Sequence, residues 1–239
     1  MASQFGLVWY LTPQFADVAM DKKILSWILS LTLIALALAI LLPGGRETDP
    51  DPKLPWDIRL EPEGGSQVFG LSLGRSTLDD ARRLFSNDGE VSLFITRDGQ
   101  PALEAYFERV FLSGLRADFV LVMESDVDTL QALFERGNRI SRTTDITHKV
   151  ELAAEDRPMV GNLPIKLINY IPAANLDAEL ITKRFGEPDE RISEAETGVV
   201  HWLYPEKGLS IGVNPDGKEL LQYVQPREVE SLIRLLKTM

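Results

Sequence analysis

Side chains that could support acid–base or nucleophilic chemistry are few in this chain. It has two histidines, His148 and His201, and no cysteine. His148 follows Asp145 closely, and four hydroxyl side chains lie from residue 141 to residue 147, so a hydroxyl–His–Asp catalytic group can be drawn there. However, the chain has no G-x-S-x-G nucleophile elbow, and this polar run is typical of a loop. We therefore expect a solvated His148, no catalytic residues and no enzymatic activity.

The sequence also has few features of a metal-binding or nucleic-acid-binding protein. The lack of cysteine excludes thiolate metal sites and a disulfide framework. Asp216 lies in an N-P-D-G-K run that lacks the alternating ligands of an EF-hand calcium loop, so we expect a turn there. The formal net charge of −11 argues against a general nucleic-acid-binding protein, which needs Lys and Arg to neutralise phosphates. We predict no metal, no cofactor and no nucleic-acid partner.

Aromatic side chains are the remaining candidates for a functional surface. Trp202 and Tyr204 share one face of a predicted strand, His201 comes directly before Trp202 as a half-exposed residue, and Tyr106 lies on another strand. In one interpretation Trp202 and Tyr204 pack under a helix. In the other they face outward and form a protein-binding hot spot. We take Tyr106, His201, Trp202 and Tyr204 as candidate binding residues.

The elements that must position these residues begin with an apolar segment at residues 24–42. It carries no charge, and at about 1.5 Å per residue it matches a hydrocarbon core of roughly 30 Å. We expect a transmembrane helix there. Lys22 and Lys23 precede it, so we expect a cytoplasmic N-terminus (residues 1–23) and an exported remainder. A cleaved signal peptide and a buried core helix are the alternatives, and Met20 is an alternative start of the chain.

A tether and two similar halves follow this segment. Residues 43–55 contain four prolines and are typical of a semi-rigid extended spacer. Residues 56–170 and 171–239 each show helix, antiparallel strands and helix in the same order, which indicates an internal duplication. Strand-like runs at 147–152 and 163–170 either complete the first sheet or bridge the two. We predict an α+β fold of two tandem small modules, each an antiparallel sheet with helices packed on one face.

The second half resembles a known family. It contains I-T-K-R-F-G-E-P-D at 181–189, V-H-W-L-Y-P at 200–205, G-L-S-I at 208–211 and D-G-K at 216–218. These runs resemble the SmpA/OmlA and beta-lactamase-inhibitor-protein-like (BLIP-like) module. G-R-S-T-L-D-D at 74–80 is a weaker match in the first half, where F-S-N-D-G at 85–89 lacks the proline. The resemblance covers at most residues 68–137 and 174–225.

The resemblance implies binding rather than catalysis, because members of this family are small exported modules that pack against protein partners. Many are lipoproteins with an N-terminal cysteine, which this chain lacks. We therefore expect a non-enzymatic, single-pass inner-membrane protein with a periplasmic domain, acting as an accessory or assembly subunit on an envelope protein partner. The alternative is a periplasmic small-molecule-binding or sensory domain. A closed apolar pocket would favour the alternative, and an open apolar groove would favour a protein partner.

Overall fold

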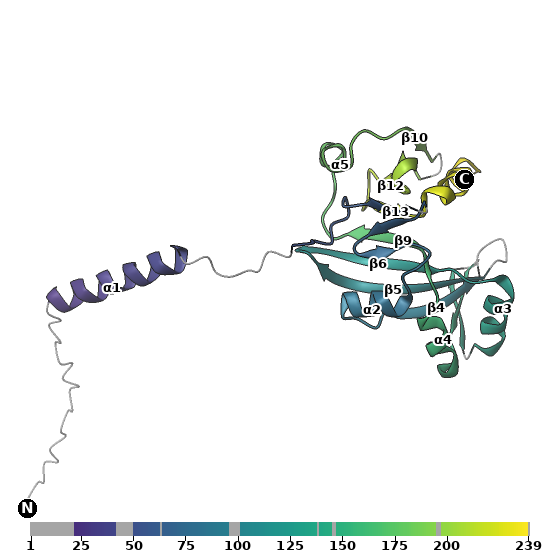
Figure 1. Ribbon diagram of the computed structural model, residues 1–239, viewed down its shortest axis with the longest axis horizontal. Coiled ribbons are helices and arrows are strands. Elements are labelled where there is room, and N and C mark those ends of the chain that lie inside the picture. The colour runs from purple at the N-terminus through teal and green to yellow at the C-terminus, as the bar shows by residue number, and fades with distance from the viewer. Residues whose placement is uncertain are drawn as a thin grey trace, which may run out of the picture. The chain divides into compact units, whose positions relative to one another are not determined.

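The computed structural model of the chain describes residues 22–41, 50–62, 64–95, 101–137, 139–144, 147–194 and 197–238. This part has mixed helix and strand content. The chain divides into two compact units, Met1–Asp49 and Pro50–Met239. Figure 1 shows the elements of both units in chain order.

The described element of the first unit is helix α1, Lys22–Leu41. Its side chains from residue 23 to residue 38 are exposed, and the Thr32 hydroxyl donates to the carbonyl of Ile28 at 2.8 Å. Within the described ranges, no helix has the length and apolarity needed to cross a membrane. The prediction of a transmembrane helix over residues 24–42 is wrong on this finding.

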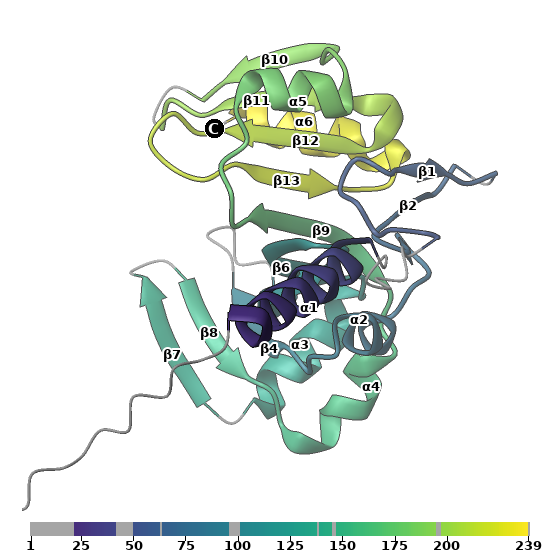
Figure 2. The same ribbon diagram turned by 90° about the vertical axis from the view of Figure 1, so that its left-hand side faces the viewer.

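The second unit is built on one ten-stranded antiparallel sheet with the order β10-β11-β12-β13-β9-β6-β5-β4-β8-β7. A separate three-stranded sheet, β1-β2-β3, lies beside it (Figure 2). The strands are β1 Arg59–Leu60, β2 Ser66–Val68, β3 Leu71–Ser72, β4 Glu90–Ile95, β5 Pro101–Leu112, β6 Leu115–Met123, β7 Arg139–Thr144, β8 Thr147–Glu151, β9 Ile165–Pro172, β10 Glu190–Ser193, β11 Val200–Tyr204, β12 Leu209–Val213 and β13 Leu220–Tyr223.

Strand β9 joins the two halves of the large sheet. Its residue Tyr170 is paired with Phe119 of β6 on one side and with Leu221 of β13 on the other. The prediction of two tandem modules with separate sheets is therefore wrong. Of the two segments that the sequence left open, the one at 163–170 bridges the halves, and the one at 147–152 extends the first half by pairing with β4.

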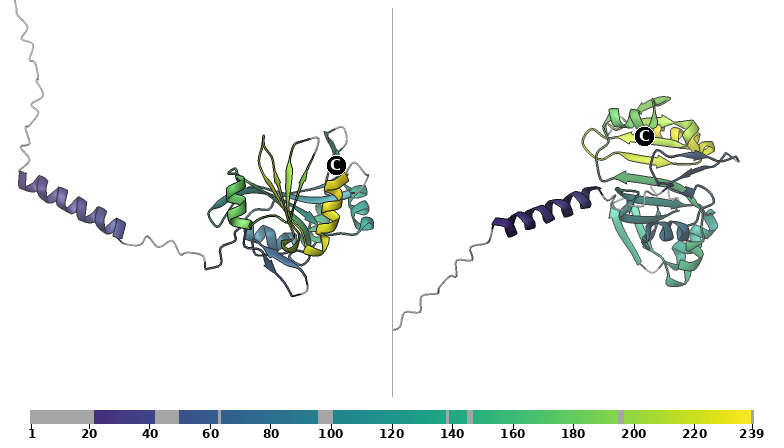
Figure 3. Two further views of the ribbon diagram at one scale, coloured as in Figure 1. Left: turned by 90° about the horizontal axis from the view of Figure 1, so that it is seen from above. Right: turned by 60° about the vertical axis from the view of Figure 1, so that its left-hand side comes forward.

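The helices of the second unit cover both faces of the sheet rather than one. Helix α2 packs on β5, and α3 packs on β4 and β5. Figure 3 shows the green α5 and the yellow α6 on opposite sides of the strands from β10 to β13. Both faces of β11 are buried as a result. The helices are α2 Leu78–Phe85, α3 Val127–Arg136, α4 Arg157–Gly161, α5 Ala178–Phe185 and α6 Val229–Thr238, with short 3-10 turns η1 Ala154–Asp156, η2 Pro205–Lys207 and η3 Pro226–Glu228.

Helix starts follow local sequence signals closely. Thr77 and Asp80 form a reciprocal capping box at the start of α2. The carboxylates of Asp126 and Asp177 accept hydrogen bonds from the N–H groups of Thr129 and Leu180, at 2.7 Å each, and cap α3 and α5. Local chemistry therefore sets where these helices begin.

The polar segment around residue 141 differs from expectation. It forms strand β7, paired with β8 at the edge of the sheet, instead of a loop. Polar and charged side chains are common on edge strands, because they discourage the unpaired backbone groups of the edge from pairing with another chain. The segment before β9 forms the short helix α4, in which Pro158 occupies a first-turn position. Asp145 lies outside the described residues.

An aromatic cluster fills the core where the two halves meet. The ring of Phe119 on β6 lies 5.1 Å from Phe69, 4.6 Å from Phe85 and 5.2 Å from Tyr170, measured between centroids. These residues come from the small sheet, α2, β6 and β9. Their contacts hold both sheets and a helix together.

We predict that Phe119→Ala lowers the free energy of unfolding by about 3–5 kcal/mol, because it leaves a cavity among these rings. The measurement is urea denaturation of the full chain, with tryptophan fluorescence as the signal that monitors unfolding. Phe111→Ala is the matched control: Phe111 is 73% exposed, so its removal should change stability by less than about 0.5 kcal/mol. An equal decrease in the free energy of unfolding in the two variants would contradict a major contribution of this cluster to stability.

Candidate functional site

Trp202 and Tyr204 are core residues. They are 8% and 2% exposed and belong to the main hydrophobic cluster. The Tyr204 ring lies 6.3 Å from that of Phe185 on α5, and its hydroxyl donates to the carbonyl of Gly186 at 3.0 Å. This burial supports packing under a helix and removes both residues from the exposed candidates.

His201 is buried on the opposite face of β11 and is not half-exposed as expected. It is 8% exposed, and its Nε2 lies 3.9 Å from the Glu194 carboxylate. Its Nδ1 is buried and has no hydrogen-bond partner among the described residues. Burial lowers the pKa of His201, and the effect of the nearby Glu194 carboxylate opposes this shift.

The remaining sequence candidates lie apart from one another. Tyr106 on β5 is 39% exposed, and partial burial together with the nearby Asp118 carboxylate raises its pKa. His148 is the second residue of β8, the strand next to the edge strand β7. Its side chain lies outside the described part. The structure therefore does not bring Tyr106, His201, Trp202 and Tyr204 together in one site.

A different surface has the character of a binding site. An open cavity of about 500 Å³, here called the α5 groove, lies between α5, the end of β9 and the turn that joins β5 to β6. Its volume falls in the usual range for ligand sites. The α5 groove is lined by Pro55, Trp56, residues 114–116, Tyr170, residues 172–176, Leu180, Ile181, Arg184 and Phe185.

The floor of the α5 groove is apolar and firmly held. Ile181 and Phe185 are buried in the main core, and Tyr170 is 4% exposed. Burial raises the pKa of Tyr170 to about 12, so its phenol stays neutral at physiological pH. Leu180, one turn before Arg184 on α5, is half-buried. The floor therefore offers carbon surface without a charge.

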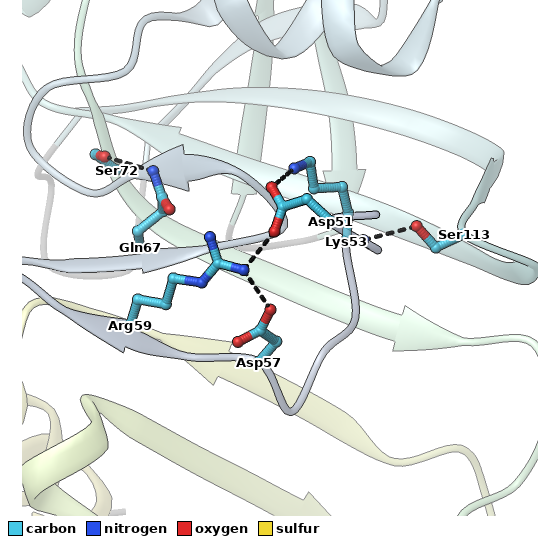
Figure 4. A network of polar contacts seen from close by, with 7 residues as sticks. All are labelled: Asp51, Lys53, Asp57, Arg59, Gln67, Ser72 and Ser113. Atoms are coloured by element: carbon cyan, nitrogen blue, oxygen red, sulfur yellow. Dashed lines mark hydrogen bonds and ion pairs between the residues drawn. The ribbon is translucent and has the colours of Figure 1, made fainter. Parts of the chain in front are cut away.

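One wall is formed by Pro55 and Trp56, and a polar network fixes the chain on either side of them (Figure 4). Asp51 is ion-paired with both Lys53 and Arg59, and Arg59 also contacts Asp57 at 2.9 Å. The Lys53 N–H donates to the Ser113 hydroxyl at 2.7 Å. These contacts tie residues 51–59 to one another and to the β5–β6 turn.

Buried hydrogen bonds complete this wall and the loop opposite it. The Tyr223 hydroxyl donates to the Pro55 carbonyl at 2.9 Å, and the Ala173 N–H donates to the Arg116 carbonyl at 2.9 Å. The buried Glu219 carboxylate accepts from the Leu176 N–H at 2.8 Å. Because buried polar groups are costly to leave unpaired, these bonds give the loop a defined position.

Two arginines lie at the rim of the α5 groove. The Arg184 guanidinium stacks over the Trp56 ring, 4.3 Å from its centroid. Arg116 is exposed at the start of β6. Neither guanidinium forms an ion pair with an acid within the described ranges. The rim is therefore cationic in a chain whose net charge is −11.

A second cavity, of about 620 Å³, differs in chemistry. It lies beside β4 and β8, and its walls mix acids and bases. Lys149 is ion-paired there with Glu90, and Arg82 contacts Asp79 at 2.9 Å and the Asp88 carbonyl at 2.8 Å. Acidic and basic side chains therefore line this cavity together. Among the residues that the structure places, no group of three His, Asp or Glu side chains is arranged to hold a metal ion.

Sequence reasoning did not identify the α5 groove. One signal was available: Leu180 and Arg184 are four residues apart and so lie next to the Ile181–Phe185 stripe on the α5 surface. No local pattern connects this helix face to Trp56 or Arg116, because these residues meet only through the sheet.

Comparisons with known proteins assign no family. No family model matches the chain, and no curated protein matches it. A solved structure of a DUF4309 family protein (YjgB) from Bacillus subtilis subsp. subtilis str. 168 is similar with a TM-score of 0.37 and 10% identity, covering 68% of this chain and 88% of that one. A likeness at this level carries no argument about function. The resemblance to the SmpA/OmlA and BLIP-like module stays a prediction.

The buried His201 generates a pH prediction. Because its pKa is lowered in the fold, protonation favours the unfolded chain, and the contribution of His201 to stability is present above pH 6.5 and lost as pH falls below it. We expect His201→Gln to reduce the loss of stability between about pH 6.5 and pH 5. The measurement is urea denaturation of both full chains across this range. Since His148 is present in both chains, identical pH profiles would contradict a neutral, buried His201.

Proposed function

We propose that this chain is a non-enzymatic docking module, an accessory subunit that holds a protein partner by an apolar segment seated in the α5 groove. The observation that carries the proposal is the groove itself, which is open to solvent and has an apolar floor under a rim of Trp56 and Arg184. Tryptophan and arginine are enriched among residues that dominate binding energy at protein interfaces.

The rigidity of the α5 groove supports this proposal. Its walls are held by the Tyr223–Pro55 and Leu176–Glu219 hydrogen bonds, and its floor is part of the main core. A surface that is already ordered loses little conformational entropy when a partner binds. The partner's location in a bacterial envelope, with this domain in the periplasm, stays a prediction from the sequence.

Binding of a small molecule is the second candidate function. The observation that favours it is the cavity volume of about 500 Å³, which suits a single drug-sized ligand. The open side of the α5 groove favours the protein partner, because a small ligand would remain partly in contact with water. Native mass spectrometry of the purified full chain distinguishes the two, since a retained small molecule adds a defined mass.

We predict that Leu180→Glu weakens binding of the protein partner at least about tenfold, because it places a charge in the apolar floor and an acid one helical turn before Arg184. A protein retained by the full chain is identified, purified and titrated against the wild type and the variant. Leu60→Glu is the matched control, since Leu60 is 60% exposed and lies outside the α5 groove. Equal affinity of both variants for the purified partner, or no retained protein, would overturn the proposal.

A further inference from the structure

We infer that the partner segment recognised by the α5 groove is acidic as well as apolar: an apolar group enters the groove, and a carboxylate next to it binds Arg116 and Arg184. This inference rests on the proposed docking function and adds the charge of the partner segment. It follows from the positions of two guanidinium groups relative to an uncharged floor.

The first step is that these two cations are available to a ligand. Arg116 and Arg184 are both exposed, and neither is ion-paired within the part of the chain that the structure places. By contrast, Arg59, Arg82 and Arg191 each contact a carboxylate of this chain. An anionic ligand can therefore bind the two rim arginines without first breaking an internal ion pair.

The second step is that Arg184 is held in position. Its guanidinium stacks on Trp56, and a stacked guanidinium can still donate hydrogen bonds from N–H groups at the edge of its plane. The network around Asp51 and the Tyr223–Pro55 hydrogen bond hold the segment that carries Trp56. A preorganised guanidinium recognises a carboxylate with two parallel hydrogen bonds at a reduced entropic cost.

The third step is the local concentration of positive charge. A smaller cavity beside the α5 groove shares Arg116 and Ala173 with it and is also lined by Arg109 and Lys218. The Arg109 guanidinium is ion-paired with Glu108 at 3.2 Å, and the Asp118 carboxylate accepts a hydrogen bond from the Arg109 backbone N–H at 2.8 Å. Arg184, Arg116 and Lys218 are therefore the cations here without an ion pair among the described residues, and they attract acidic segments although the whole chain is acidic.

A matched pair of fluorescent probes tests the inference directly. 1-Anilinonaphthalene-8-sulfonate is an apolar ring system with one negative charge, and N-phenyl-1-naphthylamine has the same rings without the charge. Both are titrated into the full chain, and the signal that persists in Leu180→Glu is subtracted because it reports binding elsewhere, including at the exposed apolar residues of α1.

We expect the anionic probe to bind the wild type about tenfold more tightly than the neutral one, the scale of a charged hydrogen bond. In the double variant Arg116→Gln, Arg184→Gln this advantage should be lost while the neutral probe still binds. Arg227→Gln is the matched control, because Arg227 is exposed and does not line the α5 groove. The advantage should also shrink as salt is raised.

The outcomes separate the inference from the proposed function. If the neutral probe binds the α5 groove but the anionic probe binds no better, or if Arg227→Gln removes the advantage equally, the acidic segment is refuted and docking stands. If neither probe gives a signal sensitive to Leu180→Glu, the groove accepts no apolar group. In that case both the inference and the docking proposal fail.

Discussion

Strand β9 is hydrogen-bonded on both sides, and the architecture of the second unit depends on this pairing. It lies between β6 of the first half and β13 of the second, so two sets of strands become one sheet. Backbone groups in the middle of a sheet must be paired when they are buried, because an unpaired buried N–H or C=O is costly. Removing β9 would leave two long inner edges exposed at once.

The continuous sheet also places side chains from distant parts of the sequence next to one another. Tyr170 of β9 meets Phe119 in the aromatic cluster, and it also forms part of the floor of the α5 groove. Packing of the core and the shape of the proposed binding surface are therefore coupled through one residue of one strand. A change in this region is expected to affect stability and binding together.

Charge is distributed unevenly over this acidic chain. Many acids are used in local structure: Asp80, Asp126 and Asp177 cap helices, and Asp51 holds the network beside Trp56. Around the α5 groove, in contrast, Arg116 and Arg184 have no internal acid partner among the residues described. Acidic side chains therefore cap helices in one part of the unit, and unpaired arginines form a cationic rim in another.

The sequence by itself determined most of the local structure of the second unit. The strand-like runs at 147–152 and 163–170 are strands β8 and β9, and Asp126 and Asp177 each cap the helix that they begin. These features depend on residues a few positions apart, so a local pattern contains the information. The same kind of pattern predicted a membrane span at 24–42, which the structure contradicts, and missed the edge strand β7.

Tertiary structure alone decided how the halves join and where the site lies. The sequence left the role of residues 163–170 open because strand pairing is chosen by partners that lie far away in the chain. It left two interpretations for Trp202 and Tyr204, packing under a helix or facing outward, and the strand that carries them is covered on both faces, which buries them. Trp56, Arg116 and Arg184 are distant in sequence and come together only when the ten-stranded sheet forms, so no spacing of residues could reveal the groove that they line.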